Sequence, residues 1–431
     1  MLKRRLIRCM KFILSKEMVQ FILTIAVMLL LFFKFGKHFE DIDLDIFIAF
    51  VYAYGSMLIA RVIYVLVSRL KEDACKLTQD YSGLCKKYNR ENLLKYCNRI
   101  GGQLVETTFP EICLTVRKIK DAPYDIIMDN RHARKVYQLP DEILEHYDWI
   151  INAHAESLKY NSRTVRLDDF SKNGNRITLT YSNATYWDLL MTNRAMDYEW
   201  DNGKTTREIY EPGPYINSLS ESEMTNYIGF NGLIEIPHHG ILFVKRSHKV
   251  SVGKGRWATG VSAKLDVRYD YKRGEYLTVD NIYESIASSI NRELKYIKLN
   301  GNDINVKPED VKDSIFAFYR DIVEGGKPQF LFYYRFPCDN NQGMACEIKK
   351  KRKTKTMKHD RKVAAIDGDK FKFISVEELR ASVINNKGIK QPNKLFYNKM
   401  VPSMSASVVL LLRALEDKEE SWNQRDKGNE K

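Results

Sequence analysis

The sequence predicts an α+β fold in which an N-terminal two-helix transmembrane hairpin precedes a cytosolic domain with a mixed sheet and flanking helices. Three observations lead to this expectation. Two apolar stretches, 18–33 and 46–67, lie near the N-terminus of the 431-residue chain. Short segments of alternating or β-branched residues then recur between Gly, Asn and Pro breaks, as strands do. Two longer segments have the periodicity of amphipathic helices.

The two apolar stretches are long enough to cross a membrane. The first has sixteen residues without a charge, and the second has twenty-two that are interrupted only by Arg61, whereas a spanning helix needs ~20. A signal peptide is the alternative for the first stretch, but its apolar core would end at a small-residue cleavage site. Basic residues flank the pair and the loop 35–45 is acidic. The positive-inside rule therefore places both termini in the cytoplasm.

Small residues form a seam along the second stretch. Ala49, Ala53, Ser56 and Ala60 recur at intervals of four and three residues. Because small side chains allow helices to approach closely in lipid, we expect this seam to drive transmembrane assembly. Arg61 lies beside it and either extends to the interface or contributes a cation to a helix cluster.

The net charge of +14 is concentrated in two segments. Residues 1–11 carry five basic side chains, and 349–362 carries nine basic side chains and one aspartate. The second run is either a solvated loop or a contact for anionic membrane lipid. No nucleic-acid-binding module accompanies it, so we do not expect duplex nucleic acid as a partner.

The cysteines and histidines do not indicate a metal site. The seven cysteines include no CxxC pair, so we expect reduced thiols. His238 and His239 are adjacent, and neighbouring side chains point apart on a strand. We therefore expect no metal and no cofactor.

Composition and breaks divide the chain into five parts. These are a basic N-terminus with the hairpin (1–69), a helical stalk (70–100), an extension or small subdomain (101–164), a ligand-sensing domain (165–417) and a polar tail (418–431). The stalk has apolar residues at heptad-like spacing over fewer than three heptads, so it either pairs with a second copy or packs on its own domain.

Strands and helices alternate in the second half of the chain. A helix is expected near 141–157. The expected strands are 176–181, 232–236, 241–245, 260–268, 315–319 and 329–336. Two further helices are expected at 281–297 and 403–416.

The helix at 281–297 carries a partial motif. Thr278, Glu284, Arg292, Glu293 and Leu294 keep the spacing of the Nudix box, G-x5-E-x7-R-E-U-x-E-E-x-G-U, in which U is apolar. The segment therefore resembles a Nudix box, with Thr278 in the place of a glycine. The likeness implies a Nudix-like fold, to which the strand order and the segment 322–328 also point.

The motif departs from the family where that family binds metal. Tyr296 and Ile297 stand in place of paired glutamates, and Leu299 replaces the closing glycine. Residues three and four apart share a helix face, so glutamates at 293, 296 and 297 would converge on one cation. With Glu293 alone, we expect a degenerate domain without catalytic residues and without hydrolysis.

A cleft without metal can still bind nucleotide through cations and aromatic rings. The ligand-binding candidates are Arg246, Arg256, Trp257, Lys264, Phe230, Asn231 and Glu293. Exposed strand positions for the cations and core packing for Trp257 are the alternatives. Glu293 projects within the apolar stripe of its helix and is either a pocket residue or the partner of a buried cation.

Two spans before a degenerate Nudix domain resemble the transmembrane-Nudix effectors of bacterial cyclic-oligonucleotide-based antiphage signalling (CBASS). The resemblance implies a multi-pass inner-membrane protein that senses a cyclic nucleotide made by a partner nucleotidyltransferase, forms homo-oligomers and disrupts the membrane in antiviral defence. The alternatives are a membrane-anchored Nudix hydrolase of nucleoside diphosphate derivatives, with metal ligands from Glu284, Glu293 and Glu324, and an adaptor that recruits another protein.

Overall fold

The computed structural model describes most of the chain after residue 76. The described residues are 77–100, 102–154, 161–246, 255–265, 267, 274–338, 346–348, 368–391, 394–395, 400 and 402–416, with six residues between 52 and 63. The chain divides into two compact units, Met1–Ala74 and Cys75–Lys431. In the first unit the six described residues are all helical.

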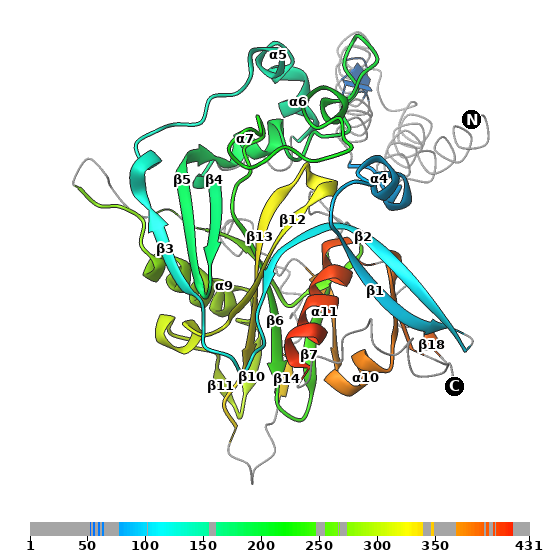
Figure 1. Ribbon diagram of the computed structural model, residues 1–431, viewed down its shortest axis with the longest axis vertical. Coiled ribbons are helices and arrows are strands. Elements are labelled where there is room, and N and C mark those ends of the chain that lie inside the picture. Colours follow the sequence, from blue (N-terminus) through cyan, green and yellow to red (C-terminus); the bar gives the residue numbers. More distant parts are fainter. Residues whose placement is uncertain are drawn as a thin grey trace, which may run out of the picture. The chain divides into compact units, whose positions relative to one another are not determined.

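A nine-stranded mixed sheet forms the centre of the second unit (Figure 1). Its order is β1 (Leu93–Ile100), β2 (Gln103–Val116), β12 (Ile315–Asp321), β13 (Lys327–Arg335), β6 (Gly229–Ile236), β7 (Gly240–Arg246) and β15 (Gly368–Ile374), with β8 (Trp257–Thr259) on β7 and β9 (Val261–Lys264) on β6. β13 and β6 run parallel, and the other pairs are antiparallel.

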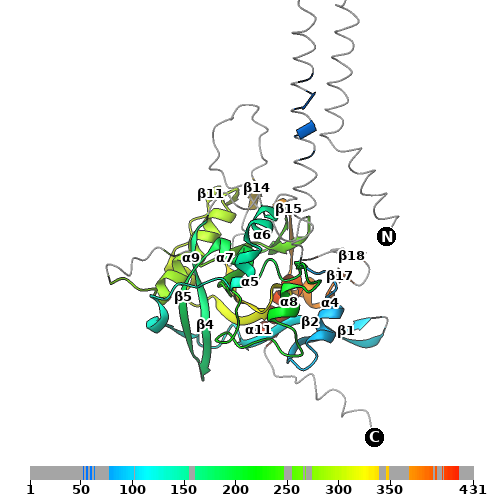
Figure 2. The same ribbon diagram turned by 90° about the horizontal axis from the view of Figure 1, so that it is seen from above.

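Three small sheets surround the main one. They are β3 (Asp125–Asp129), β5 (Arg176–Thr185) and β4 (Arg163–Asn173); β11 (Asn302–Asp303), β10 (Ile297–Leu299) and β14 (Cys346–Ile348); and β16 (Val383–Asn385), β17 (Gly388–Gln391) and β18 (Lys394–Leu395). The β3–β5–β4 sheet lies at one end of the unit, with α9, and the β1–β2 hairpin lies at the other (Figure 2).

In the described part of this unit, the helices are short apart from two. The short ones are α4 (Tyr81–Lys87), α5 (Asp141–Glu145), α6 (Tyr147–Ala153), α7 (Tyr186–Met191), α8 (Thr206–Tyr210) and α10 (Val376–Arg380), with 3-10 turns η1 (Asn130–His132), η3 (Pro308–Val311) and η4 (Ile322–Glu324). The long ones are α9 (Val279–Glu293) and α11 (Pro402–Leu415).

The main sheet has a separate hydrophobic core on each face. Along β12, Ile315 and Phe318 belong to the cluster that contains α9, whereas Phe316 and Tyr319 belong to the cluster that contains α11. Successive strand residues point to opposite faces, so the two long helices cover opposite sides of the sheet. Because a helix covers each side of the sheet, every residue of β12 is buried and neither face of the strand is exposed to solvent.

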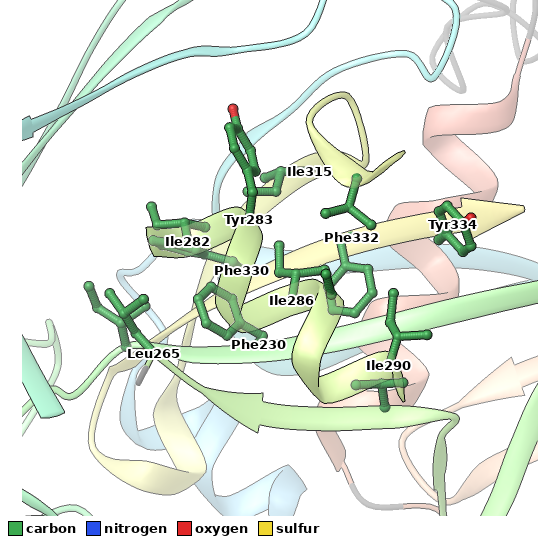
Figure 3. Packing of buried hydrophobic residues seen from close by; sticks show 14 of the residues in the cluster. Phe230, Leu265, Ile282, Tyr283, Ile286, Ile290, Ile315, Phe330, Phe332 and Tyr334 are labelled. Atoms are coloured by element: carbon green, nitrogen blue, oxygen red, sulfur yellow. The ribbon is translucent and has the colours of Figure 1, made fainter. Parts of the chain in front are cut away.

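Aromatic rings fill the core beneath α9. Figure 3 shows Ile282, Ile286 and Ile290 of the helix against Phe230 and Phe330 of the parallel strand pair. The ring centroids of those two phenylalanines are 5.3 Å apart, a separation typical of favourable ring contacts.

Gly232 of β6 leaves space for the ring of Phe332. A Cβ on Gly232 would lie 2.1 Å from Cζ of Phe332, so only glycine fits beneath that side chain. The ring of Phe332 thus packs directly on the backbone of the adjacent parallel strand.

The α+β class with a mixed sheet is confirmed, and so are most of the expected elements. The strands expected at 176–181, 232–236, 241–245, 315–319 and 329–336 match β5, β6, β7, β12 and β13. The expected helices match α9 and α11 in part. α9 begins earlier than expected, with Thr278 as its N-cap in a capping box with Asn281. It also ends earlier, at Glu293, and Ile297 belongs to strand β10 instead of the helix. The helix expected near 141–157 is divided into α5 and α6.

The helical stalk expected over 70–100 is wrong for the described part of that range. Only α4 is helical, and residues 93–100 form β1, the edge strand of the main sheet. The heptad-like spacing ends at Tyr88, which is the C-cap of α4 and is fully buried. The spacing thus reflects packing of α4 on its own domain rather than a continuous helix.

The transmembrane part of the expected fold class is contradicted. Among the residues that the structure describes, no helix is long and apolar enough to cross a membrane. The stretch 18–33 lies outside these residues, as do most of 46–67, the basic run 349–362 and the tail from 418. The prediction of a transmembrane hairpin, and with it the multi-pass inner-membrane location, is therefore wrong on this finding and is not carried further.

Candidate functional site

Two of the predicted cations are neighbours on one strand pair. The amide of Arg246, at the end of β7, donates to the carbonyl of Arg256 at 2.8 Å, and the amide of Gly255 donates back to Arg246 at 3.1 Å. Each arginine lines a different pocket. Backbone hydrogen bonds thus join a residue of one pocket lining to a residue of the other.

The first pocket, called the α9 pocket here, lies at the C-terminal end of α9 and has a volume of about 20 Å³. It is lined by Val244, Arg246, Ala258, Thr259, Gly260, Ser262 and Glu293. A water molecule needs roughly 10–15 Å³ of such space. The α9 pocket therefore accommodates a water or a small ion and is too small for a nucleotide.

Glu293 lies at a pocket, as one alternative expected, but the cation that it pairs with is exposed rather than buried. Its carboxylate lies 3.2 Å from Nε of Arg292, and it also lines the α9 pocket with Arg246. The side chain is 18% exposed, so the ion pair is partly shielded from water. The structure thus brings Arg246 and Glu293 together at the end of the helix that carries the partial Nudix box.

The second pocket, called the α4 pocket here, has a volume of about 310 Å³. It is lined by Gln79, Asp80, Tyr81, Ser82, Arg256, Asn386, Lys387 and Met400. These residues come from the start of α4, the residue before β8, the β16–β17 turn and the residues before α11. Its volume lies at the lower end of the ~300–1,000 Å³ typical of small-molecule sites.

Charge in the α4 pocket favours an anion. Arg256 and Lys387 are the cations of the lining, and Asp80 is its carboxylate. Asp80 is already engaged, because its Oδ1 accepts the amide of Gly83 at 2.9 Å and caps α4. Two positive charges against one committed negative charge leave the lining net positive.

Tyr81 supplies an aromatic face and a hydroxyl at the same place. Its hydroxyl accepts a hydrogen bond of 2.8 Å from Nη1 of Arg256. Burial raises the pKa of Tyr81, and the charges of Asp321 and Glu111 add to the increase, while Arg256 opposes it. Tyr81 is therefore a neutral donor and acceptor in the pocket at neutral pH.

The other ligand-binding candidates lie outside both pockets. Phe230 is fully buried in the core, and Asn231 is buried with its amide nitrogen 3.0 Å from the hydroxyl of Tyr319. Trp257 packs partly on the core beneath α11 and pairs with Met400 through its backbone. Lys264 donates to the carbonyl of Arg163 at 3.3 Å.

The remaining residues of the partial Nudix box lie where they contribute to the fold rather than to a pocket. Glu284 is exposed and lies 3.5 Å from the side-chain amide of Asn281, and Arg292 is also exposed. Ile297, where the motif calls for a carboxylate, is buried in the core and pairs with Ile348 in the β10–β14 strand pair. That position therefore contributes an apolar side chain to the fold rather than a ligand.

Glu324 lies in a buried ion-pair network beside Arg246. Its carboxylate is 3.2 Å from Lys327 and 3.3 Å from Arg194. Burial raises the pKa of Glu324, but the positive charges of Arg194, Lys327 and Arg246 outweigh burial and leave the pKa below its usual value. Lys327 also lies 4.6 Å from the ring centroid of Tyr227.

The three carboxylates named for an alternative metal site are each engaged in a different place: Glu284 at the exposed start of α9, Glu293 at its end and Glu324 in the buried network. Within the described part of the chain, no three His, Cys, Asp or Glu side chains are grouped so that they could hold a metal ion.

The predicted seam falls largely outside the described residues. Ala49, Ala53 and Arg61 are not among them, while Ser56 and Ala60 are helical and exposed. The structure therefore does not test transmembrane assembly.

Of the eight residues that line the α4 pocket, sequence reasoning named only Arg256 and missed the other seven, among them Asp80, Tyr81 and Lys387. The Asp80-x-x-Gly83 spacing is compatible with an N-cap, and 385–388 (Asn-Asn-Lys-Gly) has the composition of a tight turn between strands. These signals indicate local structure only. Nothing in them shows that the two segments lie beside Arg256.

No protein-family model matches the chain, and no curated protein is significantly similar to it. The geometry of the site is therefore the ground for a functional proposal.

Proposed function

We propose that the unit Cys75–Lys431 is a sensor that binds a phosphate-bearing nucleotide without hydrolysing it, with cyclic oligonucleotide second messengers as its ligand class. The observation that carries the proposal is the α4 pocket, in which Arg256, Lys387 and Tyr81 line one space of about 310 Å³. Guanidinium and ammonium groups bind phosphate, and an aromatic face stacks on a base. The volume suits one nucleotide unit, with the rest of a larger ring outside.

Two features support binding over hydrolysis. The helix of the partial Nudix box ends in Glu293, followed by Tyr296 and the buried Ile297, so one face does not gather three carboxylates. Glu324 is already neutralised by Arg194 and Lys327. Magnesium in octahedral coordination needs several oxygen ligands. A cyclic nucleotide from a partner nucleotidyltransferase in antiviral signalling remains part of the proposal, and membrane disruption does not.

The proposal is tested by titration calorimetry on the full chain. Pyrophosphate and a panel of cyclic di- and trinucleotides are titrated into the protein and into the Arg256→Gln and Lys387→Gln variants. Each variant removes one charge-assisted contact, so affinity should fall about tenfold or more, which corresponds to about 1.4 kcal/mol. The matched control is Arg176→Gln, since Arg176 is exposed and pairs with Asp125 at 2.8 Å.

Three results would overturn the sensor. The first is equal affinity in Arg256→Gln and the parent protein for every compound that binds. The second is no binding of any compound. The third is magnesium-dependent release of nucleoside monophosphate products from a bound compound, detected by chromatography, and this result would favour the hydrolase.

A further inference from the structure

Two buried carboxylates face each other beneath α4. Glu111 of β2 and Asp321 of β12 are directly opposite in the antiparallel register, and they are 0% and 3% exposed. Opposite residues on one face of such a pair have Cβ atoms about 4.5–5.5 Å apart. The proposed ligand site makes no use of this pair.

Glu111 lacks the partners that a buried charge needs. Neither of its carboxylate oxygens has a hydrogen-bond partner among the residues that the structure describes. Asp321 accepts the amide of Val323 at 2.9 Å. A buried carboxylate without partners is stable only in its neutral form, and two adjacent carboxyl groups resist ionising together. The pair therefore holds at least one proton in the folded protein.

The titration of the pair follows from its surroundings. Burial raises the pKa of Glu111 well above its usual value, and Asp321 raises it further. Burial also raises the pKa of Asp321 to about 7, with the charge of Glu324 adding to the increase and Lys327 opposing it. The unfolded chain gives up both protons near pH 4, so the free energy of unfolding falls as pH rises from about 4 through 7.

α4 is the element that covers the pair. Leu84 of α4 packs in a small cluster with Ile322 and Val323, next to Asp321. The titratable side chains that α4 places near the pair are Tyr81 and Cys85. Burial, with a contribution from the charge of Glu111, raises the pKa of Cys85 to about 12.

Other elements complete the surroundings of the pair. Tyr319 of β12 is fully buried, and burial together with the charges of Asp321 and Glu111 raises its pKa well above the usual value. Glu324 and Lys327, from η4 and β13, are the charged neighbours of Asp321. Within the described residues, the carboxylate oxygens of Glu111 have no hydrogen-bond partner, and the charge that acts on Glu111 is that of Asp321.

We infer that the protonated pair of Glu111 and Asp321 acts as a latch that keeps α4 on the sheet. A helix of seven residues is unstable without tertiary contacts. In water both carboxyl groups ionise near pH 4, so rising pH favours a state in which α4 has left the sheet and exposed the pair. Releasing α4 costs less than opening the sheet, because a small apolar cluster and single hydrogen bonds such as that of Arg256 to Tyr81 hold the helix. The consequence for ligand binding rests on the proposed function, because Asp80 and Tyr81 belong to the α4 pocket. The release of α4 itself does not depend on the proposed function.

Hydrogen exchange on the full chain tests the latch. Protection factors of the amides of α4, corrected for the intrinsic pH dependence of exchange, are compared at about pH 5 and about pH 9, on either side of the Asp321 pKa. The parent protein should lose protection at α4 by about tenfold or more at the higher pH. Glu111→Gln mimics the protonated acid and removes the proton release of Glu111, so α4 should stay largely protected at both values although Asp321 still titrates.

The matched control is Glu106→Gln on the same strand, since Glu106 is half exposed and pairs with Lys95 at the surface. It should behave as the parent protein does. If Glu111→Gln fails to fold, Asp321→Asn provides the same test, because its side-chain oxygen can still accept the amide of Val323. Protection of α4 that is independent of pH in the parent protein, or a loss of protection that persists in the folded variant, would overturn the latch.

Pyrophosphate titrations at the same two pH values separate the two proposals. Binding that weakens at the higher pH in the parent protein but not in Glu111→Gln supports both. If protection of the α4 amides depends on pH but pyrophosphate binds at neither pH value, the latch is supported and the proposed function is contradicted. Binding at both values with α4 equally protected contradicts the latch alone.

Discussion

Arg256 donates a hydrogen bond of 2.8 Å to the hydroxyl of Tyr81 and so joins the strand pair β7–β8 to the start of α4. The same guanidinium also lies 3.5 Å from the carbonyl of Met400, just before α11. One side chain thus connects three segments that are far apart in the sequence. The wall of the α4 pocket depends on that connection.

Tyr81→Phe should weaken pyrophosphate binding severalfold, because the ring stays while Arg256 loses the acceptor that orients it. A hydrogen bond to a charged group contributes about 1.5–3 kcal/mol, so the free energy of unfolding should fall by about that amount. Calorimetry and urea unfolding give the two values. Tyr215→Phe is the control, since Tyr215 is 56% exposed and outside the pocket. Equal affinities in the two variants would contradict the role of the hydroxyl.

Gly325→Ala should destabilise the protein more than Gly174→Ala does. Both glycines have positive φ, at +64° and +59°, so the strained backbone should lower the free energy of unfolding by about 1 kcal/mol in each variant. A Cβ at Gly325 would also lie 2.5 Å from Sδ of Met196, whereas one at Gly174 meets nothing within 4 Å. Overpacking adds about 1–3 kcal/mol. Urea unfolding of the two variants measures the difference, and equal values would show that the turn adjusts freely.

Lys327→Met should lower the free energy of unfolding by about 3–5 kcal/mol, because it removes one of the two cations that neutralise the buried Glu324. Lys95→Met is the matched control, since Lys95 pairs with Glu106 at the surface and an exposed pair contributes less than about 1 kcal/mol. Chemical denaturation measures both. A loss under about 1 kcal/mol for Lys327→Met would show that Arg194 alone suffices for Glu324.

Phe230→Ala should reduce stability by about 3–5 kcal/mol through the cavity that it leaves against Phe330. Ligand affinity should stay close to that of the parent protein while the variant is folded, because Phe230 reaches neither pocket. Leu144→Ala, at an exposed position, is the stability control. Lost affinity in a variant of unchanged stability would instead place Phe230 at the ligand.

Local sequence patterns predicted elements well and long-range pairing poorly. The stripe of Ile282, Ile286 and Ile290 predicted α9, and the β-branched and aromatic run of β13 predicted that strand, because both signals lie within a few residues. The parallel pairing of β13 with β6 joins distant segments, and no local pattern specifies it. The assignment of 93–100 to a stalk failed for the same reason.

The site was only partly predictable. Arg246, Arg256 and Glu293 were named from residue type, and the structure places all three at pockets. Lys387 lies on an exposed turn, where a lysine is ordinary, so its type carried no signal. Glu111 is one carboxylate within a strand, and nothing in the local sequence shows that it lies opposite Asp321.

The position of β2 between β1 and β12 sets a limit on truncation. A fragment that begins near residue 165 would lack the hairpin Leu93–Val116. β12, which is buried along its whole length in the protein, would then be an exposed edge strand of the sheet. Its unpaired amide and carbonyl groups and its aromatic side chains would then recruit strands from other molecules, and the fragment would precipitate. Recombinant work therefore needs a start upstream of α4.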